Sequence, residues 1–292
     1  MSSLPLLPQF DRDVAFSRTV GLVTKGELDI LKNKTVAVAG LGGVGGSHVL
    51  TLVRLGIGGI HIADMDTFGV ENFNRQAGAS MDSLGQEKVK VLESMARAIN
   101  PEIRIKTFPK GVTKENQNEF FEGVDAYVDG LDFFAFDARK MVFRFCYQKG
   151  IPATTVGPIG MSAALINFLP GHMSFDDYFQ WKETDSEQEL AIKFLIGLSP
   201  KTPHLKYIVD RSAVNLKEHK GPSTPMACDL CAGIAVTEVL KILLNRGTVL
   251  SAPNSIVFDA YHNRIFKSNV WFGNRNPIQK FKLAIARRML KK

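Results

Sequence analysis

The segment TVAVAGLGGVGGSHVL, at residues 35–50, decides the fold class of this chain. Residues 35–40 form a short, β-branched apolar run that ends in glycine, which is typical of a buried strand. A glycine-rich turn follows, and residues 46–55 continue with helical spacing. A strand, a glycine turn and a helix in this order begin a βαβ unit, so the segment predicts a Rossmann-like α/β fold.

Three of the five glycines in the turn, Gly40, Gly42 and Gly45, have the spacing of a phosphate-binding loop, and Gly43 lies between them. Glycine lets the backbone approach a phosphate closely, and the helix that follows offers unpaired N–H groups. The next predicted strand, 58–66, reaches Asp64 about twenty residues further on, where an acid that binds a ribose is expected. A tight turn without a ligand is the alternative. The loop therefore predicts a nucleotide site but does not decide between a dinucleotide and ATP.

Strands and helices alternate along most of the chain. Further strands are predicted at 103–108, 125–132, 153–160 and 255–261, and the clearest helices at 84–99, 138–149 and 232–245. This alternation predicts a mostly parallel sheet with helices on both faces. We expect an N-terminal helical arm at 1–33, a core domain at 34–274 with a long irregular crossover segment at 171–225, and a basic tail at 275–292.

The composition narrows the class of protein. Of the 292 residues, 45% are apolar and 22% are charged, which fits a globular chain and excludes intrinsic disorder. No apolar run reaches the roughly 18 to 20 residues that span a bilayer, so we predict no transmembrane segment. The N-terminus does not resemble a signal peptide, and three cysteines do not suggest a disulfide framework. We therefore expect a cytoplasmic protein.

Polar residues cluster after the strands that flank the glycine loop. An arginine and a lysine near such a loop suit a triphosphate, and Asp132 after the fourth strand suits Mg²⁺. Each has an ordinary alternative: Arg75 and Lys88 as surface charges, Asn72 as the cap of a turn, Asp132 as a helix cap. Their joint position favours a site. The cluster comprises Asp64, Asp66, Asn72, Arg75, Gln76, Lys88 and Asp132.

Five short stretches resemble one family when they are taken together: GLGGVGG, DMDTFGVENFNRQ, GQEKV, INP and VDGLD. They resemble the activating-enzyme superfamily of ThiF, MoeB and HesA over residues 14–168, and again at 233–244. The resemblance implies ATP-dependent adenylation of a carboxylate with release of pyrophosphate. The acceptor would be the C-terminus of a carrier protein, a peptide or a small molecule.

The resemblance also implies roles for single residues. Gly43 would lie on the phosphates of ATP and Asp64 on its ribose. Asp132 would hold Mg²⁺, and Arg18 would reach into the site of a partner subunit, which implies a homodimer. The remaining phosphate contacts would come from Asn72, Arg75, Gln76 and Lys88. The residues that act in catalysis would be Arg75, Lys88, Asp132 and Arg18.

The chain departs from the family at its cysteines. Many members bind structural zinc through two CxxC pairs, but this chain has one, Cys228 and Cys231. Because zinc normally needs four ligands, we predict that these are two buried side chains and not a zinc site. Residues 161–225 contain no cysteine, so a thioester step is not predicted, although Cys228 at the far end of the crossover stays open.

The basic tail carries the whole formal charge of +7, because 275–292 holds seven basic residues and no acid. Its apolar residues Ile278, Phe281, Ile285 and Met289 recur at helical spacing. Such a helix binds an anionic membrane, RNA or a partner groove, and the alternative is a terminal helix packed on its own domain.

Three other functions compete with adenylation of a carrier, peptide or small molecule. LVRLGIGGIHIADMD resembles the branch of tRNA threonylcarbamoyladenosine dehydratases, and the basic tail suits RNA. A non-catalytic scaffold that keeps the nucleotide pocket is the second. NAD-dependent oxidoreduction is the third, and Arg75, Lys88 and Asp132 count against it.

Overall fold

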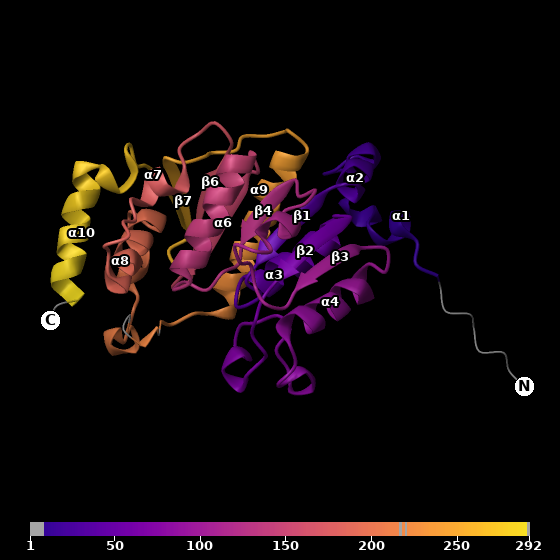
Figure 1. The fold of residues 1–292 in the computed structure, drawn as a ribbon, viewed down its shortest axis with the longest axis horizontal. Coiled ribbons are helices and arrows are strands. Elements are labelled where there is room, and N and C mark those ends of the chain that lie inside the picture. Colours follow the sequence, from indigo (N-terminus) through magenta and orange to yellow (C-terminus); the bar gives the residue numbers. More distant parts are fainter. Residues whose placement is uncertain (1–8, 216–217, 220, 291–292) are drawn as a thin grey trace, which may run out of the picture.

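The computed structural model describes residues 9–215, 218–219 and 221–290, and its centre is one eight-stranded sheet (Figure 1). The strand order is β3-β2-β1-β4-β5-β6-β7-β8. Strands β1 to β5 are parallel, and β6, β7 and β8 are each antiparallel to the strand before. The predicted α/β fold with a mostly parallel sheet is confirmed. The strands are β1 (Thr35–Ala39), β2 (Gly59–Ala63), β3 (Arg104–Phe108), β4 (Ala126–Asp129), β5 (Ala153–Ile159), β6 (Ser162–Phe168), β7 (Asn254–Asp259) and β8 (Arg264–Asn269).

Helices cover both faces of the sheet, and the alternation of side chains along β1 shows how. Val36 and Val38 join the apolar core under α3, α4 and α9, whereas Ala37 and Ala39 join the aromatic core under α5 to α8. This is the period of two that a strand buried on both faces must have. The helices are α1 (Arg12–Ala15), α2 (Lys25–Lys32), α3 (Gly45–Leu55), α4 (Lys88–Ile99), α5 (Gln117–Phe120), α6 (Phe136–Lys149), α7 (Phe175–Phe179), α8 (Glu187–Leu198), α9 (Pro225–Leu243) and α10 (Pro277–Leu290).

The N-terminal arm is helical in its described part, which begins at residue 9; residues 1–8 of the predicted arm lie outside it. Helix α2 begins with a capping box between Thr24 and Glu27. Arg12 donates a hydrogen bond to the carbonyl of Gly56, and the ring of Phe16 packs against the same glycine. The arm is therefore fixed to the C-terminal end of α3.

Two strands, β6 and β8, have no counterpart in the sequence analysis. Each is the second arm of a hairpin, and β5 and β6 are joined by only Gly160 and Met161. Gly160 takes a positive φ of 64°, which a turn this tight requires. Apolar residues occur on both sides of Gly160, between 153 and 168, so hydrophobicity alone does not show where the chain reverses.

The crossover segment 171–225 is less irregular than predicted, because it contains α7 and the twelve-residue helix α8. Helix α8 is apolar on several sides, since it lies between the aromatic core and α10. A helix buried in this way lacks the one-sided periodicity by which helices are recognised. This prediction was wrong for α7 and α8.

The basic segment 275–292 is not a free tail within its described residues. Helix α10 packs on α8 at the end of the molecule (Figure 1), so the alternative of a terminal helix packed on its own domain is confirmed. Within the described ranges, no helix is long and apolar enough to cross a membrane.

Candidate active site

The four glycines of the loop fall into two groups by what surrounds them. A Cβ on Gly40 would lie 2.2 Å from the carbonyl oxygen of Gly130, and one on Gly45 would lie 1.8 Å from that of Gly40. Gly40 lets the ends of β1 and β4 approach each other, and Gly45 lets the start of α3 approach Gly40. Gly42 and Gly43 instead face side chains, namely Gln76 and Arg75. The open face of the loop is therefore at Gly42 and Gly43, beside the N-terminus of α3, where phosphates bind in such folds.

Asp64 lies at the carboxyl end of β2 beside the loop. Its carboxylate accepts hydrogen bonds from the backbone N–H groups of Leu41 and Asp66. Asp66 forms an ion pair of 3.0 Å with Lys88, whose side chain is buried at the start of α4. Lys88 is thus held at the edge of the sheet, and the alternative of an ordinary surface lysine is wrong.

Arg75 and Gln76 come from the loop after β2 and lie against the phosphate loop. The Nε atom of Arg75 is 3.5 Å from where a Cβ on Gly43 would be, and Nε2 of Gln76 is 3.8 Å from the same point on Gly42. The side-chain oxygen of Gln76 is buried and has no hydrogen-bond partner among the residues that the structure describes. Asn72 is buried, and its side-chain oxygen accepts from the N–H of Gly69, so this residue does cap a turn.

Asp132 follows β4 at the same edge of the sheet, and its side chain is exposed. One carboxylate oxygen accepts a hydrogen bond of 2.9 Å from the N–H of Phe134 before α6. This bond closes a local turn before α6, whose N-cap is Ala135 without a side-chain cap, so the alternative of a helix cap is wrong. The second oxygen stays available to a cation, so the local role and the predicted magnesium role are compatible.

A buried ion pair beneath Asp132 is absent from the sequence analysis. Arg139 lies 2.9 Å from the carboxylate of Asp129, and both side chains are almost fully buried. Arg139 also donates to the carbonyls of Leu131 and Asp132. Thr155 adds a hydrogen bond of 2.8 Å to Asp129. This network of hydrogen bonds fixes the turn that carries Asp132. The sequence signals the network only through Asp129, the acid within the predicted fourth strand.

The end of the predicted crossover segment, just before α9, lies beside the phosphate loop. Ser223 pairs with Gly160 of the β5–β6 turn and accepts from the side chain of Asn74 through its carbonyl. The Cys228 sulfur is 3.2 Å from where a Cβ on Gly43 would be. Burial raises the pKa of the Cys228 thiol, and Ser223 and Arg75 oppose that shift.

Cys228, which borders the loop, belongs with Cys231 to helix α9. Cys228 and Cys231 are both buried in the core under α9, and the described residues contain no group of three or more potential metal ligands. Arg18 is exposed and is not brought to the loop of its own chain. Its neighbour Phe16 packs on Gly56 at the far end of α3, about 16 Å from the phosphate loop by helix length.

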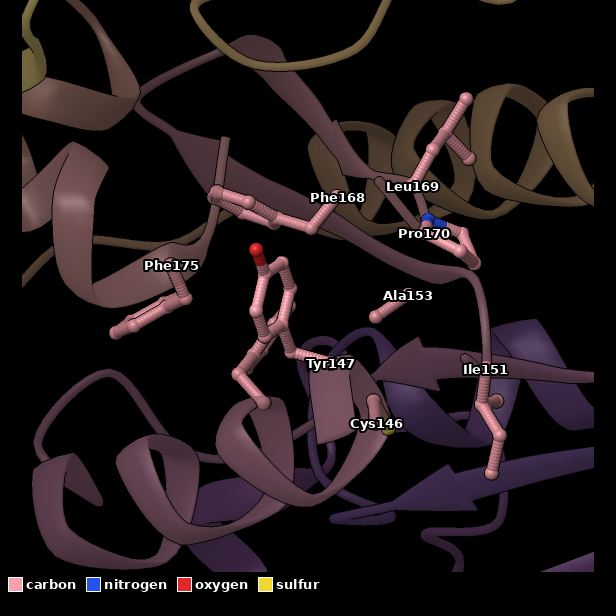
Figure 2. Close-up of a pocket in the computed structure, with 9 residues that line it drawn as sticks. Cys146, Tyr147, Ile151, Ala153, Phe168, Leu169, Pro170 and Phe175 are labelled. Atoms are coloured by element: carbon pink, nitrogen blue, oxygen red, sulfur yellow. The ribbon is translucent and has the colours of Figure 1, made fainter. Parts of the chain in front are cut away.

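A small apolar pocket lies at the opposite edge of the sheet and does not belong to this site (Figure 2). It is lined by α6 and by the strands β5 and β6, with Ala153 at the start of β5. Its thiol, Cys146, has a pKa raised well above the usual value by burial, so it is an inert core side chain.

Three comparisons agree with this geometry. The tRNA threonylcarbamoyladenosine dehydratase of Bacillus subtilis (strain 168) is 36% identical over 138 residues, 47% of this chain and 54% of that protein. The sulfur carrier protein adenylyltransferase of Thermus thermophilus is 34% identical over 104 residues, 36% of this chain and 38% of that protein. A solved structure of Escherichia coli MccB with ATP is similar in fold, with a TM-score of 0.62 at 22% identity, and covers 83% of this chain and 65% of that one.

These matches are partial, since the chain spans about half the length of the first curated relatives it matches. The profile of the ThiF family, in contrast, matches residues 16–278, which include every element from η1 (Ser17–Thr19) to β8. That range holds the glycine loop and all the polar residues gathered around it. The chain belongs to the ThiF family.

Proposed function

We propose that this chain is an ATP-dependent adenylyltransferase that activates a carboxylate as an acyl-adenylate. The observation that carries the proposal is the position of Arg75 and Gln76 against the open face of the loop at Gly43 and Gly42. A guanidinium and an amide at that place suit a triphosphate. The curated relatives named for adenylation and dehydration, and the MccB structure solved with ATP, support it.

The chemistry follows from the charges at the edge of the sheet. A carboxylate oxygen attacks the α-phosphorus, the bond to the β-phosphate oxygen breaks, and pyrophosphate leaves. Arg75 and Lys88 offset the charge that develops on the phosphates, and Asp64 orients the ribose. Asp66 is exposed and neutralises the charge of buried Lys88 only in part. A phosphate of bound ATP would supply the second anion that makes burial of this lysine favourable.

Magnesium fits the same site. Asp132 offers one carboxylate oxygen that its own turn does not use, and Mg²⁺ typically binds one or two carboxylates together with phosphate oxygens. Bound there, the ion would neutralise charge on the polyphosphate. The buried, unpartnered oxygen of Gln76 further suits a site that is completed by a ligand.

The proposal includes a homodimer in the cytoplasm. Arg18 is exposed and remote from its own loop, so a role in catalysis requires the site of a second subunit. Mixing Arg18→Ala with Lys88→Ala protein tests this, because random pairing leaves about one quarter of the sites with both residues intact. No recovery of activity in the mixture would exclude the shared site.

The experiment that tests the activity is ATP–pyrophosphate exchange across carrier proteins, peptides and small carboxylic acids. We expect Lys88→Ala and Asp132→Ala to abolish exchange without changing the unfolding midpoint. Lys90→Ala is the matched control, because Lys90 is exposed on α4 and forms an ion pair with Glu87 in the same turn. Full exchange in both site variants would contradict the proposal.

A second candidate is activation of a carboxylate on a modified tRNA base, which the similarity to the dehydratase favours. The basic segment 275–292 suits contacts with phosphates, so tRNA binding should weaken steeply as salt rises. Binding that stays constant between low and moderate salt would argue against it.

A further inference from the structure

Helix α10 packs on the protein through a different face from the one that its apolar pattern indicates. Ile278, Phe281 and Ile285 recur every three or four residues and so share one side of the helix. In the structure this side is exposed: Ile278 is 66% exposed, Phe281 68% and Ile285 45%. We call these three side chains the α10 outer face; the side chain of Met289, predicted as a fourth member, lies outside the described part.

The opposite side of α10 makes the contacts with α8. Leu283 is buried against Ile192 and Ile196. Gln279 is buried and donates to the carbonyl of Ile196 at 3.2 Å. Arg287 forms two hydrogen bonds with Glu189, of 2.9 and 2.6 Å. Helix α10 therefore packs on α8 through this side, and the α10 outer face makes no part of that contact.

The chain just before α10 exposes two more large apolar side chains. Trp271 is 66% exposed and Phe272 64%. Backbone hydrogen bonds from Gly273 to Val270 and from Arg275 to Phe272 tie this turn to the start of the helix. Single exposed apolar residues are ordinary, but five large ones within fifteen residues mark a binding surface.

The charge of this region has one sign. Residues 275–292 hold seven basic residues and no acid, and they carry the whole formal charge of the chain. The α8 acid that faces the helix, Glu189, is already paired with Arg287. A binding partner for this surface must therefore be negatively charged and must also accept aromatic and aliphatic side chains.

We propose that the α10 outer face, with Trp271 and Phe272, binds the surface of an anionic phospholipid membrane. Basic residues beside exposed tryptophan, phenylalanine and isoleucine are the pattern of helices that lie in the headgroup region. The helix would lie parallel to the membrane with α8 behind it. This binding is independent of the proposed adenylation, and either can hold without the other.

Other occupants fit less well. A two-fold dimer through this face would bring two segments of +7 together, which repel each other. A partner groove needs a helix that it can enclose, but one side of α10 is already covered by α8. RNA would be held by the basic residues, and it leaves no use for exposed Ile278 and Ile285. A broad surface that is both anionic and apolar suits all the observations.

The test is sedimentation of the full chain with vesicles of phosphatidylcholine alone or with about 30% phosphatidylglycerol, in about 100 mM salt. We expect binding only to the anionic vesicles, and weaker binding as salt rises. Tryptophan fluorescence gives a second readout, because Trp181 is buried and a blue shift on binding reports Trp271. No binding to anionic vesicles would overturn the proposal.

Variants locate the binding surface. Ile278→Ser with Phe281→Ser should weaken vesicle binding at least about tenfold, and Lys280→Glu with Arg288→Glu should have the same effect. The matched control is Leu22→Ser with Val209→Ser, since Leu22 and Val209 are exposed apolar residues outside α10. The control should bind like the parent protein, and all variants should unfold at the same temperature.

Three results would overturn the proposal. One is vesicle binding that survives both sets of α10 changes. Another is a stable dimer in solution that Phe281→Ser dissociates, because the face would then bind a second copy. The third is tight binding of a single-stranded RNA oligonucleotide that the Ile278 and Phe281 changes abolish.

Discussion

Asp132 can be found from the sequence as an acid after a strand, but the residues that hold it cannot. Asp129 reads as one more acid in the same stretch, and Arg139 as one more charge on a helix. Only the fold shows that they meet in a buried ion pair. The type and position of a residue in the sequence indicate that it contacts a ligand. They do not indicate which residues hold that residue in place through buried contacts.

Removing one partner of this ion pair should be costly. Arg139→Met leaves the Asp129 carboxylate buried with hydrogen bonds but no countercharge, and we expect a loss of about 3–5 kcal/mol in the free energy of unfolding. Urea denaturation measures it. The double variant Asp129→Asn with Arg139→Met should lose less, because no unpaired charge remains; an equal or larger loss would contradict this account.

His48 predicts how stability depends on pH. Its ring is fully buried on α3 and has no hydrogen bond within the described part of the chain, and burial lowers its pKa to about 3 from 6.5. The unfolded chain therefore binds a proton below about pH 6.5 that the folded chain does not, so stability is lost as the pH falls toward 3. Between about pH 7.5 and pH 5, the parent protein should lose about 2 kcal/mol more than His48→Leu.

Urea denaturation at the two pH values checks this difference. His204, whose pKa burial lowers to about 4, stays in the variant, so some acid sensitivity should remain. An identical loss of stability in the parent and the variant would show that His48 is protonated, or exposed, in the folded protein.

The elements that position the site follow from strong local patterns. The β1–loop–α3 unit is predictable because its strand is apolar, its turn is rich in glycine and its helix starts at once. Three elements cannot be predicted in this way: the strands β6 and β8 and the helix α8. Their boundaries depend on tertiary contacts that hydrophobicity does not reveal. The sequence correctly predicts that α10 is a helix with an apolar stripe, but the stripe is not the side that packs on α8.

The two groups of loop glycines should respond differently to alanine. Gly40→Ala places a Cβ 2.2 Å from a carbonyl oxygen at a φ of 82°, so it should lower the free energy of unfolding by about 2–4 kcal/mol. Gly43→Ala meets Cys228 at 3.2 Å, so it should cost less than about 1 kcal/mol but weaken ATP binding at least tenfold.

Gly26→Ala is the control for both variants, because a Cβ at Gly26 meets nothing within 4 Å. In helix α2 it should raise stability by about 0.5–1 kcal/mol without changing ATP affinity. Denaturation and calorimetry on the three variants test the assignment, and normal ATP affinity in folded Gly43→Ala would contradict it.

At the scale of the whole molecule, the fold places every predicted nucleotide residue at one edge of one sheet. The carboxyl ends of β1, β2 and β4 are neighbours in the strand order, which brings the glycine loop, Asp64 and Asp132 together. This arrangement could be predicted, since parallel βαβ units always align their carboxyl ends. The acceptor could not, because the crossover segment that borders the site is placed by tertiary contacts that the sequence does not reveal.

The measurement that tests the central claim most directly is calorimetry of ATP binding with and without Mg²⁺, with NAD as the control ligand. We expect ATP to bind, Mg²⁺ to strengthen binding, NAD not to bind, and Arg75→Ala or Lys88→Ala to weaken ATP binding at least about tenfold. A folded protein that binds no ATP, or that binds it equally well without Arg75 and Lys88, would contradict the account.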